Sequence, residues 1–257
     1  MELKTAIPAE SGHWYARDGS PAYTIVGKNG KERNTTLRDA RSLDLVPSVT
    51  TIIRTAAAPG LERWKLQQTL LASLTLPRED GESLDDYAER VIKDSREYQN
   101  QAMNLGTEIH GSLEKAFLGE SFEVTHLPFV TAVREALQER YGTLTWVAEE
   151  SFASPEGFGG KIDLYTPAGI VIDFKTKAFN DPDKVSGFDE HLMQLAAYAY
   201  GMEEKHPALF DRAANVFIST TVPGLVKVVE WTAEDIERGW KMFSALLQFW
   251  QIKNRYA

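Results

Sequence analysis

Two short segments, residues 160–165 and 171–176, constrain the fold most, because each sets an aspartate among strand-forming residues. Aliphatic, β-branched and aromatic residues in period-two alternation are typical of β-strands. Alternation places one set of side chains on one face of each segment: Lys161, Asp163 and Tyr165 in the first, and Val171, Asp173 and Lys175 in the second. The segments therefore predict neighbouring strands that bring two acids and a lysine together.

Asp163 and Asp173 are the central pair of this prediction. Two carboxylates repel each other and a desolvated charge is costly, so such a cluster has little reason to exist unless a ligand is bound. A divalent cation between the carboxylates would remove that cost. The alternative is a pair of exposed surface acids, but Asp173 directly follows the apolar run 170–172, which is typical of a buried strand. The sequence favours a metal site, where Lys175 could orient a water or stabilise transition-state charge.

The composition is that of a globular protein, with 257 residues of which 43% are hydrophobic and 25% charged. This length suits one large domain, or a core with an appendage. The chain has no cysteine, which excludes disulfides, thiolate zinc sites and cysteine-ligated iron–sulfur clusters. It has no apolar run of membrane-spanning length and no signal-peptide pattern at the N-terminus. We expect no membrane association and a cytoplasmic location, in a bacterial or phage-infected cell.

The net charge of −9 argues at first against a nucleic-acid partner. The charge is unevenly placed, however, because residues 1–65 carry ten Lys and Arg against seven Asp and Glu. Local patches rather than the total charge decide contact with phosphates. The basic N-terminal part therefore remains compatible with binding DNA.

The pattern of strands and helices predicts an α/β protein of the α+β type, with a mixed sheet flanked by helices. Residues 1–60 form a strand-rich N-terminal extension with a hairpin at Asn29–Gly30, packed on a core of residues 61–257. Strands are expected at 144–152, 160–165, 170–176, 216–220 and 225–231. A helix from Ser83 is expected to break at Gly106, and Thr232 is expected to cap the final amphipathic helix.

Four further side chains are candidates for the site. Alternation in 144–152 puts Glu150 on the more apolar face, so Glu150 is favoured over Glu149, although a register shift by one residue would reverse this. His110 lies slightly off a helical core stripe, where a lone histidine is more often structural than a ligand. Gln194 and Tyr198 lie one turn apart among small apolar residues, which indicates either a polar pocket or a half-buried glutamine bonded to backbone.

These elements occur in a fixed order: Gly-Thr-Glu-Ile-His at 106–110, an acid-bearing strand, Gly-Gly-Lys-Ile-Asp at 159–163, Ile-Asp-Phe-Lys-Thr at 172–176 and Gln-Leu-Ala-Ala-Tyr at 194–198. The ordered set resembles the RecB-like branch of the PD-(D/E)xK nuclease superfamily. Residues 47–52 and 61–65 resemble phage exonucleases and the mitochondrial genome maintenance exonuclease in particular. The resemblance implies a restriction-endonuclease-like core and a metal-dependent DNA exonuclease acting in recombination, repair or replication.

The resemblance also implies roles for individual residues. Mg²⁺, or alternatively Mn²⁺, would be held by His110, Asp163, Asp173 and the backbone carbonyl of Phe174. Lys175 would be the catalytic lysine, and Gln194 and Tyr198 would hold DNA or Lys175. Ile162 stands where the superfamily name has proline, and the placement of Glu150 relative to the glutamate of the family stays open.

The expected partner is DNA with single- or double-stranded ends, and a recombination or single-strand-binding protein is a candidate second partner. Arg54, Arg63 and Lys65 could hold the DNA backbone, and Trp64 could stack on a base, although a core tryptophan is the more frequent case. Ser48 and Thr50 could bond phosphate or serve as helix caps. The competing functions are a non-catalytic DNA-binding or recombination module on the same fold and a structure-specific endonuclease.

Overall fold

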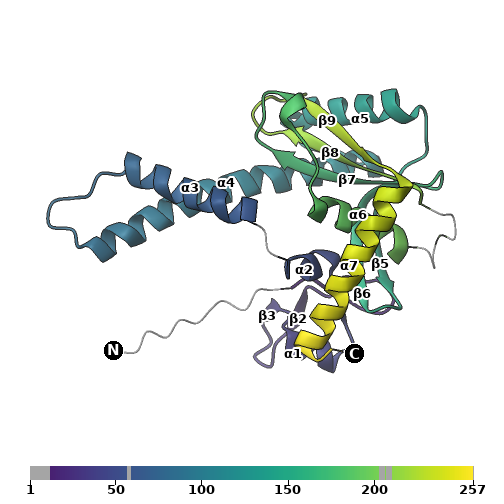
Figure 1. Cartoon of the computed structure of the whole chain (residues 1–257), viewed down its shortest axis with the longest axis horizontal. Helices are drawn as coiled ribbons and strands as arrows, with labels where there is room; N and C mark the ends of the chain where they lie inside the picture. The colour runs from purple at the N-terminus through teal and green to yellow at the C-terminus, as the bar shows by residue number, and fades with distance from the viewer. Residues whose placement is uncertain (1–11, 57–58, 203–205, 207–209, 257) are drawn as a thin grey trace.

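The strand-forming segments of the C-terminal two-thirds of the chain pair into one mixed sheet, which the computed structural model shows together with flanking helices (Figure 1). The structure describes residues 12–56, 59–202, 206 and 210–256, so the first eleven residues of the expected extension lie outside it. Within this part of the chain, five strands make up the sheet in the order β5-β6-β7-β8-β9. Their bounds are β5 Val147–Ser154, β6 Phe158–Thr166, β7 Ile170–Lys177, β8 Arg212–Ser219 and β9 Val226–Trp231.

Strand β7 occupies the middle of the sheet, which explains its continuous apolar sequence. It pairs antiparallel with β6 and parallel with β8, while β5 and β9 pair antiparallel at the two edges. Helices cover both faces of the sheet, so Ile170, Val171 and Ile172 are fully buried. The predicted mixed sheet is therefore confirmed, with β6, β7 and β8 longer than expected and β5 and β9 one residue shorter.

Two hydrophobic clusters fill the space between the sheet and its helices. The α7-side core lies under α6 (Asp189–Gly201) and α7 (Ala233–Asn254), and its buried residues include Phe158, Val171, Ala196 and Phe243. The α5-side core lies under α4 (Leu84–Leu118) and α5 (Leu127–Tyr141), and its buried residues include Ile109, Val133, Phe174 and Val216. Helix α7 begins at the predicted Thr232 cap, where Thr232 and Asp235 form a capping box.

Helix α4 is continuous through Gly106, so the expected break there is wrong. A Cβ built on Gly106 would lie 2.6 Å from Oγ1 of Thr176 on β7, closer than real atoms approach. The glycine therefore serves close packing of the helix on the sheet, and tertiary contact outweighs its poor helix propensity. This close approach brings the next turn of α4 to the end of β7.

The N-terminal extension consists of small elements: β1 Trp14–Tyr15, β2 Thr24–Val26, β3 Glu32–Asn34, α1 Leu37–Ser42, β4 Val46–Pro47 and α2 Val49–Ile53. Strands β2 and β3 form the predicted hairpin around Asn29 and Gly30, and β1 pairs with β4. Trp14, Val49 and Ile52 belong to the α7-side core, so the extension shares one core with the sheet. It lies so close to β6 that a Cβ on Gly159 would meet Tyr15 at 2.9 Å.

Helix α3 (Pro59–Thr75) and the first part of α4 form a helical hairpin that extends away from the rest of the protein (Figure 1). Several of its apolar side chains are exposed, among them Leu66, Leu70 and Leu74. None of the helices in the described part of the chain combines the length and the apolar character that crossing a membrane requires.

Candidate functional site

The site begins where β6 and β7 separate. The paired register runs from Thr166–Ile170 to Leu164–Ile172, and one step further it would place Asp163 opposite Asp173. There the carboxylate of Asp163 accepts a hydrogen bond from the Phe174 N–H at 2.7 Å. The N–H and C=O of one strand residue point to the same side, so the Phe174 carbonyl points into the same gap.

Asp173 is buried, with only 1% of the residue exposed, and its charge is compensated on every side. Lys175 Nζ lies 2.9 Å from its Oδ1 and 2.8 Å from its Oδ2. Gln194 donates to Oδ1 at 2.8 Å and Asn215 donates to Oδ2 at 2.7 Å. A buried carboxylate is stable only with such a complete set of donors, so this network fixes Asp173 and Lys175 together.

Helix α6 supplies the outer partners of Lys175. Lys175 donates to Oε1 of Gln194 at 2.9 Å, and Gln194 donates in turn to the Tyr198 hydroxyl at 2.8 Å. Burial raises the pKa of Tyr198 well above its ordinary value, and the charges of Asp173 and Asp163 raise it further, so the phenol stays neutral. Gln194 is thus bonded to side chains of the site and not to backbone. Of the two alternatives for this helix, the polar pocket is therefore the correct one.

His110 reaches the site from α4. Its Nδ1 lies 4.0 Å from Oδ2 of Asp163, and its ring stands edge-on to the ring of Phe174 with centroids 6.3 Å apart. Burial lowers the pKa of His110 more than the nearby Asp173 charge raises it. The imidazole is therefore neutral near pH 7, the form in which histidine binds metal ions.

The electrostatics of Asp163 differ from those of Asp173. Burial and the neighbouring charge of Asp173 raise the pKa of Asp163 to about 7. Its side chain keeps 23% of its surface open to the cleft, so cleft water moderates this rise. Asp163 consequently accepts a proton or a cation near neutral pH more readily than an ordinary aspartate does.

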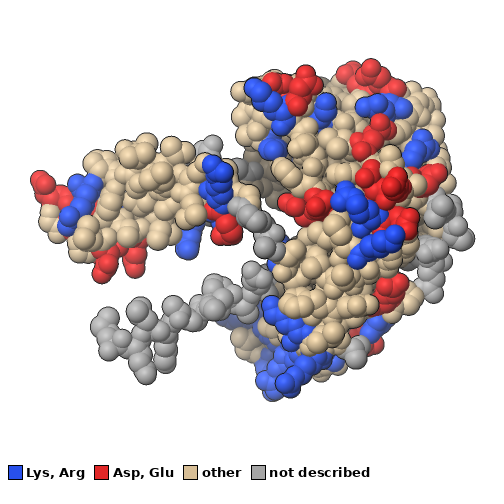
Figure 2. Space-filling model, viewed as in Figure 1, with Lys and Arg blue, Asp and Glu red and all other residues tan. Residues whose placement is uncertain are grey.

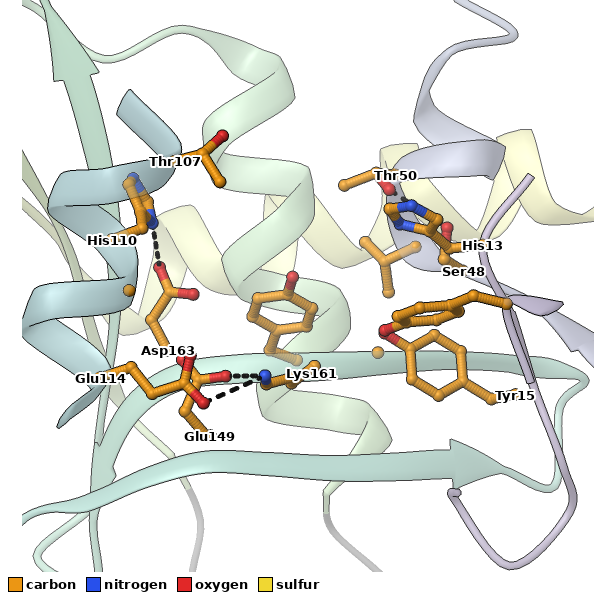
Figure 3. A pocket seen from close by; sticks show the side chains of 15 residues that line it. His13, Tyr15, Ser48, Thr50, Thr107, His110, Glu114, Glu149, Lys161 and Asp163 are labelled. Carbon is orange, nitrogen blue, oxygen red and sulfur yellow. Dashed lines mark hydrogen bonds and ion pairs between the residues drawn. The ribbon is translucent and has the colours of Figure 1, made fainter. Parts of the chain in front are cut away.

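The expected common face of Lys161, Asp163 and Tyr165 is correct for Lys161 and Asp163, which line the same cleft, and wrong for Tyr165. Ile162 and Tyr165 both pack in the α7-side core although they are three residues apart, so the alternation of β6 breaks between them. Lys161 faces α4, as Asp163 does, and there it forms an ion pair with Glu114 at 3.6 Å and another with Glu149 of β5 (Figure 3).

A break in the alternation of β5 likewise changes which of its two glutamates faces the site. Glu149 lies opposite Asp163 in the register of β5 and β6 and has a left-handed backbone with φ of 63°. This conformation is uncommon for a residue other than glycine, and it reverses the alternation on which the choice of Glu150 rested. Glu149 lines the cleft with Asp163, whereas Glu150 lies beside Tyr165, whose pKa is raised by burial and then by Glu150. The expectation that Glu150 faces the site is therefore corrected to Glu149.

A cleft of about 350 Å³ is lined by part of this site, namely His110, Glu149, Lys161, Asp163 and Tyr198, whereas Asp173, Lys175 and Gln194 do not line it. Figure 3 shows its two walls, with His110, Glu114 and Asp163 on one side and His13, Ser48, Thr50 and Tyr15 of the extension on the other. Ser48 caps α2 by accepting from the Thr51 N–H at 3.1 Å, and its hydroxyl also lies 3.1 Å from that of Thr50. Ser48 is thus both a helix cap and part of the cleft wall.

The remaining expected DNA contacts divide between two places. Arg54 is exposed at the C-terminal end of α2, and its charge adds to the effect of burial in lowering the pKa of His13. Arg63, Trp64 and Lys65 lie on α3 and do not line the cleft. Trp64 is 38% exposed, so it is not the core residue that was the more frequent expectation.

Among the described residues, no three His, Asp or Glu side chains gather closely enough to form a metal cage as they stand. The donors fit Mg²⁺ or Mn²⁺ in kind, since a neutral imidazole, carboxylate oxygens and a strand carbonyl face one gap. Asp173 already has four donor contacts, so its share in a cation depends on Lys175 releasing one of them.

Sequence reasoning missed three parts of the site. Asn215 could have been found, because it is the one polar residue within the apolar run 213–218. The ion pairs of Lys161 depend on the broken alternation and left no signal in the pattern. The wall of His13, Tyr15 and Tyr23 comes from a segment more than a hundred residues from the two aspartates, so only the tertiary structure reveals it.

Comparisons with known proteins add little to this geometry. No protein-family model matches the chain, and no curated protein sequence matches it. Among solved structures, the chain is similar to one described as "Crystal structure of SSO0001", with 18% identity over 72% of this chain and 85% of that chain. The TM-score of 0.28 is too low to carry an argument about fold or function.

Proposed function

We propose that this chain is a metal-dependent DNA nuclease with a restriction-endonuclease-like core, most simply an exonuclease, as its resemblance to the RecB-like branch implies. The observation that supports it best is the placement of the Lys175 ammonium, held between Asp173 and Gln194. Asp163 lies opposite Asp173, at the point where β6 and β7 separate. A single phosphoryl group at this gap would meet two carboxylates and one fixed positive charge.

The residues that would hold Mg²⁺ or Mn²⁺ are Asp163, His110, the Phe174 carbonyl and, after partial release of Lys175, Asp173. A bound cation supplies Lewis-acid chemistry: it lowers the pKa of a coordinated water and offsets phosphate charge. Two features of the protein favour cation binding. The lowered pKa of His110 keeps its imidazole neutral, and the negative charge of Asp163 has too few partners in the protein, so a cation beside it would be favourable.

Lys175 is the group of this chain suited to act on the phosphoryl oxygens. Its ammonium is half-buried, with 27% of the side chain exposed, and its position is fixed by Asp173 and Gln194. A fixed positive charge in a partly dry site stabilises charge that develops in a transition state. Tyr198 acts indirectly: its hydroxyl accepts a hydrogen bond from Gln194 and so orients the amide that holds Lys175.

The surface offers a route for a polyanion despite the net negative charge. Figure 2 shows Lys and Arg gathered at the end of the molecule formed by the N-terminal extension, while basic and acidic side chains are interspersed elsewhere on the face shown. Arg54 of the same extension lies near the cleft wall. Phosphates could therefore approach from the extension, where the local field favours them.

The test is digestion of end-labelled linear duplex, linear single-stranded and covalently closed circular DNA, each with Mg²⁺ and with a chelator. The proposal expects Mg²⁺-dependent loss of linear DNA with the closed circle intact. Cleavage of the closed circle would favour a structure-specific endonuclease. Binding without cleavage of any substrate would favour a non-catalytic DNA-binding or recombination module.

A further inference from the structure

An aromatic stack forms the cleft wall that the extension contributes. The rings of His13 and Tyr23 are stacked, with centroids 4.5 Å apart and an interplanar angle of 27°. Tyr23 meets Tyr15 edge to face at 5.5 Å, and their hydroxyls are 2.6 Å apart. Exposure falls along the stack, from exposed His13 through half-buried Tyr23 to buried Tyr15. Among the described residues, His13 is therefore the outer end of the stack and the most exposed of its three rings.

The stack is held in place by the sheet. Tyr15 is only 3% exposed and packs against Gly159 of β6, where a Cβ would lie 2.9 Å from the Tyr15 ring. Ser48, on the same wall, forms a β-bridge with Gly159. The wall is thus fixed relative to Asp163, four residues further along β6, and a flat ligand meets a surface that is already formed.

The chemistry of the wall suits an uncharged flat ring. Burial and then the charge of Arg54 lower the pKa of His13, so its ring is neutral near pH 7. The opposite wall carries the acids Glu114 and Asp163, which leaves the aromatic side as the apolar part of the cleft. The hydroxyl of Thr50 stands beside the stack, 3.1 Å from that of the buried Ser48, and can donate to a sugar or phosphate.

We propose that the His13–Tyr23 stack is a base-stacking platform that makes the cleft selective for one unpaired strand. This rests on the proposed function, since it names the form of DNA that reaches the same site. A cleft of about 350 Å³ lies at the lower end of the range of small-molecule pockets, roughly 300 to 1,000 Å³. A cleft of this size can hold one nucleotide. In a duplex each base stays paired with the opposite strand, so its ring is not available to stack on His13. Stacking on an aromatic side chain accepts every base, so the platform selects strandedness and not sequence.

The experiment measures binding of a fluorescent single-stranded oligonucleotide, without cleavage, in the Asp163→Asn background. Binding of the same strand with an abasic 3′ or 5′ end, and of a blunt duplex, is measured in parallel. We expect the single strand to bind more tightly than the blunt duplex, and His13→Ala to weaken binding of the intact strand about tenfold. His13→Trp should retain tight binding, and Phe249→Ala, an exposed aromatic outside the cleft, should leave it unchanged.

The abasic strands separate stacking from a general loss of structure. With the terminal base absent at the end that enters the cleft, the variant and its parent should bind equally well. Equal binding of the intact strand by His13→Ala and its parent, or equal loss on the intact and both abasic strands, would overturn the platform. Tighter binding of the blunt duplex would also overturn it. These binding outcomes are distinguishable from failure of the proposed function, which is measured separately as Mg²⁺-dependent cleavage of linear DNA by the wild-type protein.

Discussion

The Asp163 carboxylate takes the place of a strand partner for Phe174, accepting its N–H at 2.7 Å where β6 and β7 separate. The Asp163 side chain thus bridges β6 and β7 at the point where their backbone pairing ends, and it fixes the distance between the two strands there. Because the Phe174 carbonyl points into the same gap, one residue of β7 supplies both an anchor for Asp163 and an oxygen donor for the site.

Lys175→Ala should lower the turnover of DNA cleavage by about 10² to 10⁴-fold while Mn²⁺ binding is retained. The substitution removes the fixed charge but also frees both oxygens of Asp173 from their ammonium contact. Single-turnover cleavage and Mn²⁺ titration by electron paramagnetic resonance measure the two effects separately. Unchanged turnover would remove Lys175 from the mechanism, and lost Mn²⁺ binding would show that its role is structural.

Asn215→Leu should lower the free energy of unfolding by about 1 to 3 kcal/mol or more, because it leaves buried groups unpaired. Asp173 loses its donor at 2.7 Å, and the Trp231 indole N–H loses its acceptor at 2.8 Å. Urea unfolding measures the change, with the exposed Asn34→Leu as a control expected to lie within about 0.5 kcal/mol of wild type. Equal stability of both variants would contradict the network around Asp173.

Two glycines of α4 should respond in opposite directions to alanine. Gly106→Ala should destabilise the protein by about 1 to 3 kcal/mol, because its Cβ meets Thr176 Oγ1 at 2.6 Å. Gly111→Ala should stabilise it by up to about 1 kcal/mol, since a Cβ there meets nothing within 4 Å and alanine favours helix. Thermal unfolding tests both, and adding Thr176→Ala should relieve the loss at Gly106. Failure of that rescue would place the strain elsewhere.

The raised pKa of Asp163 predicts a pH dependence of stability in metal-free protein. The folded state holds the proton up to about pH 7, whereas an unfolded aspartate releases it near pH 3.9. Between these values the folded state binds more protons, so the contribution of Asp163 to the free energy of unfolding falls as pH rises. Relative to wild type, Asp163→Asn should therefore gain stability as pH rises from about 4 to about 7, and the difference should level off above that. A stability difference that does not change with pH would refute the shift.

The sequence predicted the mixed sheet and most of its strands, because the apolar runs are long and turn residues mark their ends. Residues 170–176 also placed Asp173 and Lys175 on one face correctly, as regular alternation holds along β7. Gln194 and Tyr198 were recognised as a polar pair on a small-residue helix, and the structure joins them by a hydrogen bond.

The errors arose where local rules yield to tertiary contact. Strict alternation favours Glu150 over Glu149, but the left-handed backbone at Glu149 breaks that alternation. Gly106 was read as a helix break, whereas it permits the approach of α4 to Thr176. The residue pattern within 144–165 or around 106 cannot predict these features, because they depend on contacts with neighbouring helices and strands.

The central claim is that Asp163 belongs to a cation site that cleaves phosphodiesters. The most direct measurement is the rate of linear DNA degradation by chelator-treated protein after Mn²⁺ or Mg²⁺ is restored, compared between wild type, Asp163→Asn and Glu150→Gln. We predict activity that returns with the metal in wild type, near-wild-type activity in Glu150→Gln, and none in Asp163→Asn. Metal-independent degradation, or undiminished activity in Asp163→Asn, would contradict the claim.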